Sequence, residues 1–389
     1  MKKTLLVAAL AVGFAGVAHA ETSVTLYGIA DAGIGYEKRT SANGADSKRV
    51  GLVDGVASGN RWGLKGAEDL GNGLQAVFQL ESGYDITTGS QLQSDEDTDR
   101  LFGRHATIGL KSASWGQLDF GRQTNIGSKY GAGVLSPFGA GFKLAKAGTT
   151  FTSANTNRLD NMAMYQTPSF SGFQFGIGYS FGTDGTQAFT ADGESNPNDR
   201  AFTTGLRYAN GPLAVALTYD QIKFAETGAT PGTVIPTGDF AAGVFTPVAA
   251  GVSPNAALLS PGSTGTGGGT AKAWNLGASY DFEVVKLHLG VGQERDGTYS
   301  GYSDGADANA YTVGLSAPIG AGKLMASWGM LDPRGEQSEG ENQQAYSLGY
   351  TYALSKRTDL YALGSYVKDV RFNDGAKSKI AAVGVRHAF

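Results

Sequence analysis

Short segments in which apolar and polar residues alternate recur through almost the whole chain. Residues 173–181 read FQFGIGYSF, residues 274–282 read WNLGASYDF and residues 346–352 read YSLGYTY, each with an apolar side chain at every second position. Successive side chains of a β-strand point to opposite faces, so this period of two indicates strands with one apolar and one polar face. The pattern predicts an all-β fold.

About sixteen segments follow this pattern, and we predict one strand from each. They cover residues 23–37, 60–68, 74–81, 101–110, 116–123, 161–166, 173–181, 201–208, 213–223, 271–282, 284–293, 310–318, 323–331, 344–353, 358–367 and 379–389. Hairpin connections join them in order, so each strand is expected to run antiparallel to the next.

Alternation alone does not distinguish a soluble β-sandwich from a transmembrane β-barrel. Three features favour the barrel. Connections alternate between a few residues and a dozen or more, aromatic residues such as Tyr179 and Phe181 gather at strand ends, and the polar positions are rich in Gly, Ser, Thr and Gln. We therefore predict a transmembrane antiparallel β-barrel of about sixteen strands, with short periplasmic turns and long extracellular loops.

The first twenty residues have the parts of a secretory signal peptide. Lys2 and Lys3 precede an apolar run over residues 5–16, which is followed by Ala18-His19-Ala20. The alternative, a membrane anchor, needs about 20 apolar residues and this run is shorter. We expect cleavage between Ala20 and Glu21, which leaves one barrel domain over residues 21–389. The chain has no Cys, so no disulfide stabilises the exported protein.

Two long segments interrupt the alternating pattern. Residues 225–270 are rich in Thr, Gly and Pro, and we interpret them as an external loop; the alternative is a linker between domains. Residues 124–158 contain many glycines, several aromatic residues and four bases, Lys129, Lys143, Lys146 and Arg158, but no acid. An irregular segment of this length is uncommon in a compact domain unless it is functional or disordered. We predict that it folds into the lumen of the barrel and narrows it.

Several stretches resemble the general porins of Gram-negative bacteria, especially those of betaproteobacteria. They are VTLYGIADAGI at residues 24–34, NRWGLKGAEDLGNGLQAVFQLESGY at 60–84, GRHATIGL at 103–110, WGQLDFGRQTN at 115–125 and GVRHAF at 384–389. The resemblance implies a sixteen-stranded barrel in the cell outer membrane, a homotrimer, a third loop inside the pore, and passive diffusion of small hydrophilic solutes. Residues 136–141, SPFGAG, lack the acid that porins of this kind commonly carry on that loop.

Selectivity in a wide channel depends on the diameter and on the charges that line the narrow zone, and Lys and Arg favour anions. Strand parity places Arg61 and Lys65 on the lumen face, and the loop adds Lys143 and Lys146. Similar porins keep an arginine near the narrow zone at the position of Arg122, whose direction the alternation does not fix. We predict a basic constriction and an anion-preferring pore. For each base the alternative is a solvated side chain or a structural ion pair.

Further residues are predicted to face the lumen or to close the barrel. The lumen candidates are Tyr27, Asp31, Glu81, Asp119, Arg207, Lys286, His288 and Arg386. Phe389 is expected to close the barrel against the first strand and, as in similar proteins, to act as the insertion signal. The acidic run Asp95, Glu96, Asp97 and Asp99 is either a solvated loop that contacts the next subunit or a cation site that bridges lipopolysaccharide phosphates.

Other function classes fit the sequence less well. Without residues 1–20, 29 Lys and Arg face 35 Asp and Glu, so the net charge is −6 and nucleic-acid binding is not expected. No Gly-x-Ser-x-Gly or His-Glu-x-x-His motif is present, so we predict no enzyme, no metal and no cofactor. The remaining alternatives are a channel specific for phosphate or organic anions, and an adhesin built on the loops. The expected partners are outer-membrane lipid, lipopolysaccharide and small hydrophilic solutes and anions.

Overall fold

The computed structural model describes residues 23–93, 100–183, 185, 198–225, 269–297, 306–335 and 340–389. The predictions made for the signal peptide with its Ala20–Glu21 cleavage site, for the acidic run at 95–99 and for most of residues 225–270 lie outside these residues. Within the described part, none of the helices combines the length and the apolar character that crossing a membrane would require.

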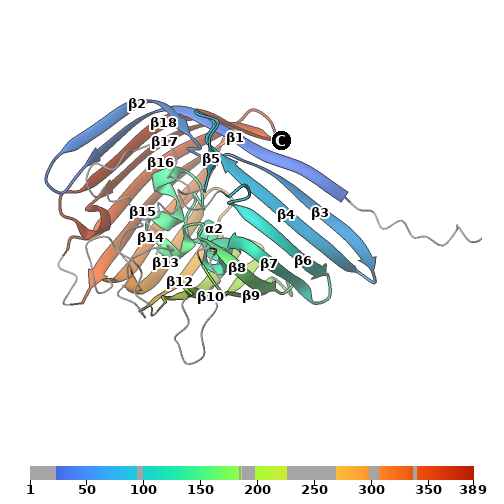
Figure 1. The fold of residues 1–389 in the computed structure, drawn as a ribbon. Coiled ribbons are helices and arrows are strands. Elements are labelled where there is room, and N and C mark those ends of the chain that lie inside the picture. The colour runs from blue at the N-terminus through green and yellow to red at the C-terminus, as the bar shows by residue number, and fades with distance from the viewer. Residues whose placement is uncertain are drawn as a thin grey trace, which may run out of the picture.

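The strands form one antiparallel sheet that closes on itself (Figure 1). The strands are β1 (Ser23–Thr40), β2 (Asp46–Asp54), β3 (Arg61–Gly71), β4 (Leu74–Tyr84), β5 (Gln91–Leu92), β6 (His105–Ser112), β7 (Gly116–Thr124), β8 (Arg158–Gln166), β9 (Phe173–Ser180), β10 (Arg200–Asn210), β11 (Leu213–Lys223), β12 (Thr270–Asp281), β13 (Lys286–Gly297), β14 (Ala306–Ile319), β15 (Gly322–Arg334), β16 (Gln343–Ala353), β17 (Thr358–Lys368) and β18 (Lys377–Ala388). The first and last strands pair over residues 29–40 and 377–388, which closes the barrel.

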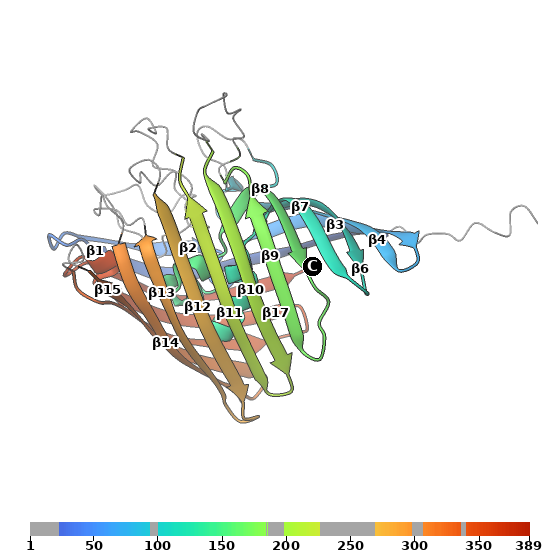
Figure 2. The same ribbon diagram turned by 90° about the horizontal axis from the view of Figure 1, so that it is seen from below.

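Eighteen segments in the described residues correspond to sixteen strands of the barrel wall. Strands β2 and β3 pair with successive parts of β1, and β5 and β6 pair with successive parts of β4, so each of these two couples is one interrupted strand. The sixteen-strand antiparallel barrel predicted from alternation is therefore confirmed. Figure 2 shows neighbouring strands such as β10, β11 and β12 running side by side with a common tilt.

The apolar positions of the alternating segments face outward. Val24, Leu26 and Ile34 on β1 are about 60% exposed, and Ile108 and Phe120 on β6 and β7 are likewise exposed. The intervening positions face the lumen, where Asp31 and Asp220 are fully buried. Large apolar side chains that are exposed on an outer wall are expected for a barrel whose solvent on that side is lipid.

Two strand segments were missed by the sequence analysis, the two-residue β5 and the longer β2. Residues 46–54 were not among the predicted strands, whereas they form β2, which extends the hairpin with β1 from Asp54 to Asp46. Residues 55–60 then leave the wall and turn inward, so that Val56 and Ala57 are buried. Asn60 holds this detour in place, because its Nδ2 donates to the Asp31 carbonyl at 2.9 Å.

The segment predicted to enter the lumen does so. It contains η1 (Gly127–Gly131), α2 (Ala132–Leu135), η2 (Lys143–Ala145), η3 (Ala147–Thr149) and η4 (Thr152–Ala154), and it lies inside the ring of strands (Figure 1). A further short helical turn, η5 (Val370–Phe372), joins β17 to β18. We call residues 125–157 the inner loop.

The barrel closes at the C-terminal residue as expected. The Gly28 amide donates to the Phe389 carbonyl at 3.0 Å, and the Phe389 amide donates to the Gly28 carbonyl at 3.1 Å. A Cβ on Gly28 would lie 2.3 Å from the Phe389 ring, so only glycine leaves room for this contact. The role of Phe389 as an insertion signal remains a prediction.

Candidate pore and constriction

The inner loop packs against one part of the barrel wall, the lumen face of β10 to β17, which we call the covered wall. Many lumen positions there are glycine, and loop side chains fill the space that results. A Cβ at Gly290 would lie 2.5 Å from Leu135 Cδ2, and a Cβ at Gly314 would lie 2.5 Å from Pro137 Cδ. Glycine at these positions therefore allows the loop to approach the strands closely.

Alanines and larger apolar residues complete this packing. Loop residue Leu135 lies among Ala308, Ala310 and Leu331 of β14 and β15, while Phe138 and Leu144 pack in a cluster with Met325 and Tyr361. Ile126 and Tyr130 at the start of the loop pack in a third cluster, with strands β8 to β12. The loop is thus fixed by apolar burial along its whole length.

Polar side chains of the covered wall bind the backbone and side chains of the loop. Asp220 accepts from Asn125 Nδ2 at 2.8 Å, and Glu294 Oε1 accepts from the Thr152 amide at 3.0 Å. Further bonds run from Gln343 Nε2 to the Thr149 carbonyl (2.8 Å), from Asn275 Nδ2 to Ser153 Oγ (2.6 Å) and between His288 Nδ1 and the Val134 carbonyl (3.0 Å). Buried polar groups with partners of this kind rigidify a packed segment.

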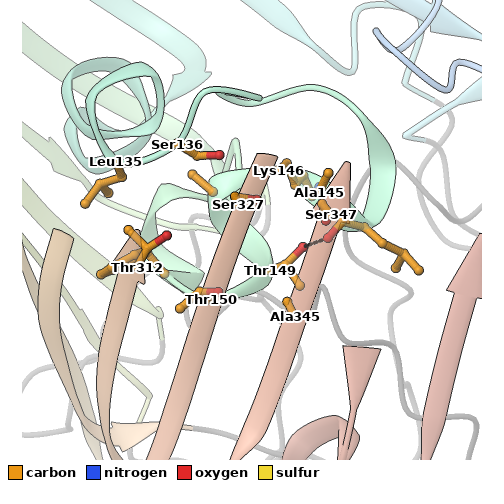
Figure 3. A pocket seen from close by; sticks show the side chains of 14 residues that line it. Leu135, Ser136, Ala145, Lys146, Thr149, Thr150, Thr312, Ser327, Ala345 and Ser347 are labelled. Carbon is orange, nitrogen blue, oxygen red and sulfur yellow. Dashed lines mark hydrogen bonds between the residues drawn. The ribbon is translucent and has the colours of Figure 1, made fainter. Parts of the chain in front are cut away.

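A small cavity remains between the loop and strands β14 to β16. Ser136, Lys146, Thr149 and Thr150 line it from the loop, and Thr312, Ser327 and Ser347 line it from the strands (Figure 3). Its volume is about 10 Å³, the space of about one water molecule. The cavity belongs to the seal between loop and wall and is too small for a solute.

The tip of the loop reaches the inward detour at residues 55–60. The Phe142 amide donates to the Ala57 carbonyl at 3.1 Å, and a Cβ on Gly141 would lie 2.2 Å from the same oxygen. Phe142 and Lys143 both have positive φ, 64° and 39°, which is rare for residues with bulky side chains. The loop therefore spans the lumen from β10 to the residues that precede β3, and we infer that the open passage lies on its other side.

The opposite part of the wall, the lumen face of β3, β4, β6 and β7, has a different character. We call it the bare wall. Its lumen positions include Arg61 and Lys65 on β3, Gln79 and Glu81 on β4, and Thr107 on β6. Strand register therefore brings Arg61 and Lys65, which were predicted to line the constriction, onto one side of the passage.

Glu81 is held in a buried ion pair rather than facing the passage freely. Its Oε1 lies 2.8 Å from Arg104 Nε, with both side chains about 5% exposed, and its Oε2 accepts from the Tyr27 hydroxyl at 2.9 Å. Gln79 Nε2 in turn donates to the Tyr27 oxygen at 2.6 Å. Because Arg104 neutralises Glu81, the acid contributes little net negative charge to the passage.

The two predicted bases of β3 differ in their surroundings. Lys65 is exposed, and its Nζ lies 5.3 Å from the centre of the Tyr27 ring. Arg61 is half-buried, and its Nε donates to the Gly59 carbonyl at 2.9 Å. Both keep their charge on the lumen side of β3.

The loop bases are more buried than the sequence suggested. Lys143 and Lys146 are 8% and 5% exposed. Burial lowers the pKa of Lys143, and the nearby Glu37 and Asp54 carboxylates partly offset this effect. Lys129 lies in η1 of the loop, where its Nζ donates to Gln123 Oε1 at 3.0 Å and burial lowers its pKa to about 8.

Arg122 is held in an ion pair. Its Nη1 lies 2.6 Å from Asp160 Oδ1, and Asp160 also binds Arg100 at 3.0 Å. The register Ile108–Phe120 and Ala106–Arg122 places Arg122 on the face of the β6–β7 pair that carries the exposed Ile108 and Phe120. We therefore leave Arg122 out of the pore described below.

The remaining lumen candidates are spread over the barrel. Asp31 is fully buried and accepts from the Tyr361 hydroxyl at 2.7 Å, and Asp119 accepts from Gln117 Nε2 at 2.8 Å. Arg386 pairs with Asp359 at 2.8 Å. Arg207 and Lys286 take lumen positions near the short-turn ends of β10 and β13.

The structure adds four bases that the sequence analysis did not single out as pore residues: His105, Arg158, Arg104 and Lys323. His105 has Arg158 and Arg104 among its charged neighbours, and Lys323 lies near Lys286. Ala106 and Ile108 are apolar and share one face of the strand, so alternation could have predicted that His105 lies on the opposite, lumen face. The sequence carries no signal that Arg158 and Arg104 lie near His105, because Arg158 begins β8 and is far from both of the others in the sequence.

Comparisons with known proteins agree with this architecture. A family model described as "Gram-negative porin" matches residues 6–371. This chain belongs to the Gram-negative porin family. An outer membrane porin protein of Bordetella pertussis is 48% identical over the full length of both chains, and outer membrane porin protein 32 of Delftia acidovorans is 31% identical, again over the full length of both.

Solved structures resemble this porin as well. An "anion-selective porin" from Comamonas acidovorans has a TM-score of 0.67 and 26% identity, covering 95% of this chain and all of the other. OmpF of Salmonella typhi, in a complex with daunomycin, has a TM-score of 0.62 at 17% identity, which shows the shared fold. The porin is thus an outer-membrane channel protein whose barrel spans the membrane many times, as the sequence predicted.

Proposed function

We propose that this porin is a general diffusion channel that favours small hydrophilic anions. The observation that carries the proposal is the charge on the two sides of the passage. The inner loop has no Asp or Glu, and the bare wall presents Arg61 and Lys65 while its nearest acid, Glu81, is paired with Arg104. The anion selectivity named for the Comamonas structure agrees with this proposal.

The mechanism we propose is electrostatic and passive. A fixed positive charge raises the local concentration of anions and lowers that of cations, and the effect is strongest where the passage is narrower than about 8–10 Å, the screening length at moderate salt. Arg61 and Lys65 supply this charge from the wall, and Lys143 and Lys146 add charge from the loop. Solutes cross without a chemical step, so the proposal involves no catalytic residue and no cofactor.

Basic residues between the loop and the short-turn end of the barrel add to the positive charge that favours anions. Arg207, Lys286 and Lys323 occupy lumen positions of β10, β13 and β15. Lys286 and Lys323 are close enough to interact. We propose that these residues form a basic vestibule through which anions leave the narrow zone toward the short-turn end of the barrel.

Bilayer recordings under a salt gradient test the proposal. The zero-current potential of the wild type should indicate anion preference, and Lys143→Glu with Lys146→Glu should reduce or reverse it. A wild type that prefers cations would contradict the anion proposal. Conductance that saturates with one anion, such as phosphate, would instead support a channel specific for that solute.

We also propose that residues 1–20 are removed on export and that the mature protein is a homotrimer. The first proposal rests on the sequence, and the second rests on family membership alone. Intact mass of the purified protein tests the first, since cleavage should leave Glu21 at the N-terminus. Mass of the protein in detergent, corrected for bound detergent, tests the second, and a single-chain mass would contradict it.

A further inference from the structure

Asp31 lies on the lumen face of β1, where it is fully buried beside the inward detour at residues 55–60. Its Oδ2 accepts from the Ser58 amide at 2.6 Å, and its backbone carbonyl accepts from the Gly55 amide at 3.0 Å. The Asn60 side chain adds two bonds, because its Oδ1 accepts from the Asp31 amide and its Nδ2 donates to the Asp31 carbonyl. Both ends and the middle of the detour are therefore bound to one residue of β1.

The other carboxylate oxygen of Asp31 is bound from β17, across the place where β18 meets β1 (Figure 1). Tyr361 donates its hydroxyl to Asp31 Oδ1 at 2.7 Å. The two residues between them, Gly384 and Gly33, are ladder partners without side chains. A Cβ on Gly384 would lie 2.2 Å from the Tyr361 hydroxyl oxygen, and one on Gly33 would lie 2.9 Å from it. These two glycines therefore allow the tyrosine to reach Asp31.

The tip of the inner loop contacts both groups that Asp31 binds. The Phe142 amide donates to the Ala57 carbonyl of the detour at 3.1 Å. The Phe142 ring meets the Tyr361 ring edge to face, with 6.3 Å between the ring centroids. Phe142 has a φ of 64°, a strained conformation that persists only where the surroundings hold it. The position of the tip therefore depends on the detour and on Tyr361.

The detour also holds a base of the bare wall. Arg61, the first residue of β3, donates from its Nε to the Gly59 carbonyl at 2.9 Å. Gly59 lies beside two guanidinium groups, since a Cβ there would be 4.0 Å from Arg61 Nη2 and 3.3 Å from Arg104 Nη1. The direction of the Arg61 guanidinium thus depends on where the detour lies.

The charge of Asp31 is poorly placed to act on ions in the passage. Asp31 is fully buried, and Arg386 is directly opposite it in the ladder. Lys143 at the loop tip also has Asp31 among its charged neighbours. Any direct effect of the carboxylate on ions must favour cations, because acids that line a channel attract them.

We propose that Asp31 is a positioning residue of the pore, which sets the width and the ion preference of the constriction through the detour and not by its own charge. Without the carboxylate, the detour would no longer be fixed, and neither would the loop tip at Phe142 or the guanidinium of Arg61. Anion preference would then fall although a negative charge has been removed. This part of the inference rests on the anion preference proposed above, whereas the effect on width does not.

Bilayer recordings under a salt gradient separate positioning from charge. A charge effect alone would raise anion preference in Asp31→Ala. We expect instead that the anion-to-cation permeability ratio of Asp31→Ala falls about twofold below that of the wild type, with noisier open-channel current. Asp31→Asn keeps one acceptor oxygen and should show a higher ratio than Asp31→Ala. Asp119→Asn removes another buried lumen acid, outside these contacts, and is the matched control in which the ratio should rise.

Two further variants disturb the same contacts without changing the charge. Tyr361→Phe removes the hydroxyl that binds Asp31 and keeps the ring that contacts Phe142. Gly384→Ala places a Cβ where that hydroxyl now lies. We expect both to lower anion preference in the direction of Asp31→Ala, by a smaller amount. Circular dichroism of each variant in detergent checks that the barrel is intact.

Liposome swelling in neutral sugars measures the width independently of ions. A constriction of fixed width slows a trisaccharide more than a monosaccharide, and a constriction that moves discriminates less. The ratio of the two swelling rates should fall in Asp31→Ala and stay unchanged in Asp119→Asn. A wild type that prefers cations would contradict the proposed anion preference, and the sugar ratio would still test the positioning role.

Two results would overturn the proposal. A rise in anion preference in Asp31→Ala equal to that in Asp119→Asn, with an unchanged sugar ratio, would show that Asp31 acts only through its charge. Wild-type ion preference and sugar ratio in Asp31→Ala would show that the detour is fixed without the carboxylate. If Asp31→Ala does not fold, Tyr361→Phe and Gly384→Ala decide, and wild-type behaviour of both in both measurements would likewise contradict the proposal.

Discussion

The covered wall and the bare wall are built from the same kind of strand but have different roles. The covered wall binds the inner loop, and the bare wall carries charged side chains that line the passage. On both, apolar residues face outward at every second position, so the outer surface does not distinguish them. They differ at the lumen positions. Gly290, Gly314 and Ala310 on the covered wall leave space that the inner loop fills, whereas Arg61 and Lys65 on the bare wall occupy the lumen themselves.

This difference shows how one barrel obtains both a constriction and its charge. Small lumen residues draw the loop to one side, because a strand without side chains leaves room for another segment to pack. Bulky charged residues on the other side keep the passage open and hydrated. The position of the pore follows from which lumen residues are small, and its selectivity follows from which are charged.

The largest effect should come from filling the space that the loop occupies. Gly290→Val with Gly314→Val would place side chains where Leu135 and the rigid ring of Pro137 now lie. Overpacking of this kind typically costs about 1–3 kcal/mol, and we expect the loop to leave the wall and single-channel conductance to change severalfold. Gly364→Val, on the outer face, is the control and should leave conductance unchanged. An unaltered conductance in the double variant would contradict the packing account.

A smaller effect is expected when one polar anchor of the loop is removed. Asp220 accepts from Asn125 Nδ2 and from the Thr203 hydroxyl, which itself accepts from the Ile126 amide at 2.8 Å. Asp220→Ala leaves these buried donors unsatisfied, at a cost of about 1–3 kcal/mol. Denaturant unfolding should show the loss, and open-channel current should become noisier. Asp220→Asn keeps an acceptor and should lose less; equal losses in both variants would contradict the anchoring role.

The charge of the bare wall should affect selectivity without affecting stability. Arg61→Gln with Lys65→Gln removes two positive charges from the passage, so the zero-current potential should move toward cation preference while conductance changes by less than about twofold. Lys272→Gln, which removes a charge on the outer face, should leave the potential unchanged. If the control shifts the potential as much as the double variant, surface charge and not the bare wall sets selectivity.

The smallest effect is expected from pH. Lys143 carries its charge only below its pKa, and burial holds that pKa below the ordinary value of a lysine, partly offset by Glu37 and Asp54. Anion preference should therefore weaken as pH rises toward alkaline values, beginning earlier than for an exposed lysine. Lys143→Arg should flatten this dependence, because guanidinium stays charged. Identical pH profiles of the wild type and the variant would show that the charge of Lys143 does not contribute to anion preference.

The strands could be predicted because the alternation of side chains is a local property. Residues 173–181 and 274–282 have the same pattern in the sequence and the same role in the barrel. Residues 46–54 were missed because their charged side chains, such as Lys48 and Arg49, suggested a loop, although Val50 and Leu52 alternate. The entry of residues 124–158 into the lumen could also be predicted, since alternation stops there.

The arrangement of the pore could be predicted only in part. Parity placed Arg61 and Lys65 on the lumen side, but it could not tell which wall the loop would cover. That choice depends on contacts such as Leu135 with Gly290, between residues far apart in the sequence. Arg122 was included because of the resemblance to other porins, whereas its ion pair with Asp160 depends on the irregular register between β7 and β8.

The central claim is that the open passage runs along the bare wall and not along the covered wall. The chain has no native cysteine, so Thr107→Cys on β6 and Ala310→Cys on β14 can each be treated with a negatively charged thiosulfonate during bilayer recording. We predict that Thr107→Cys is modified quickly, with a stepwise fall in current and in anion preference. Ala310, which is fully buried beneath the loop, should not react. Modification of Ala310→Cys at the rate of Thr107→Cys would contradict the account.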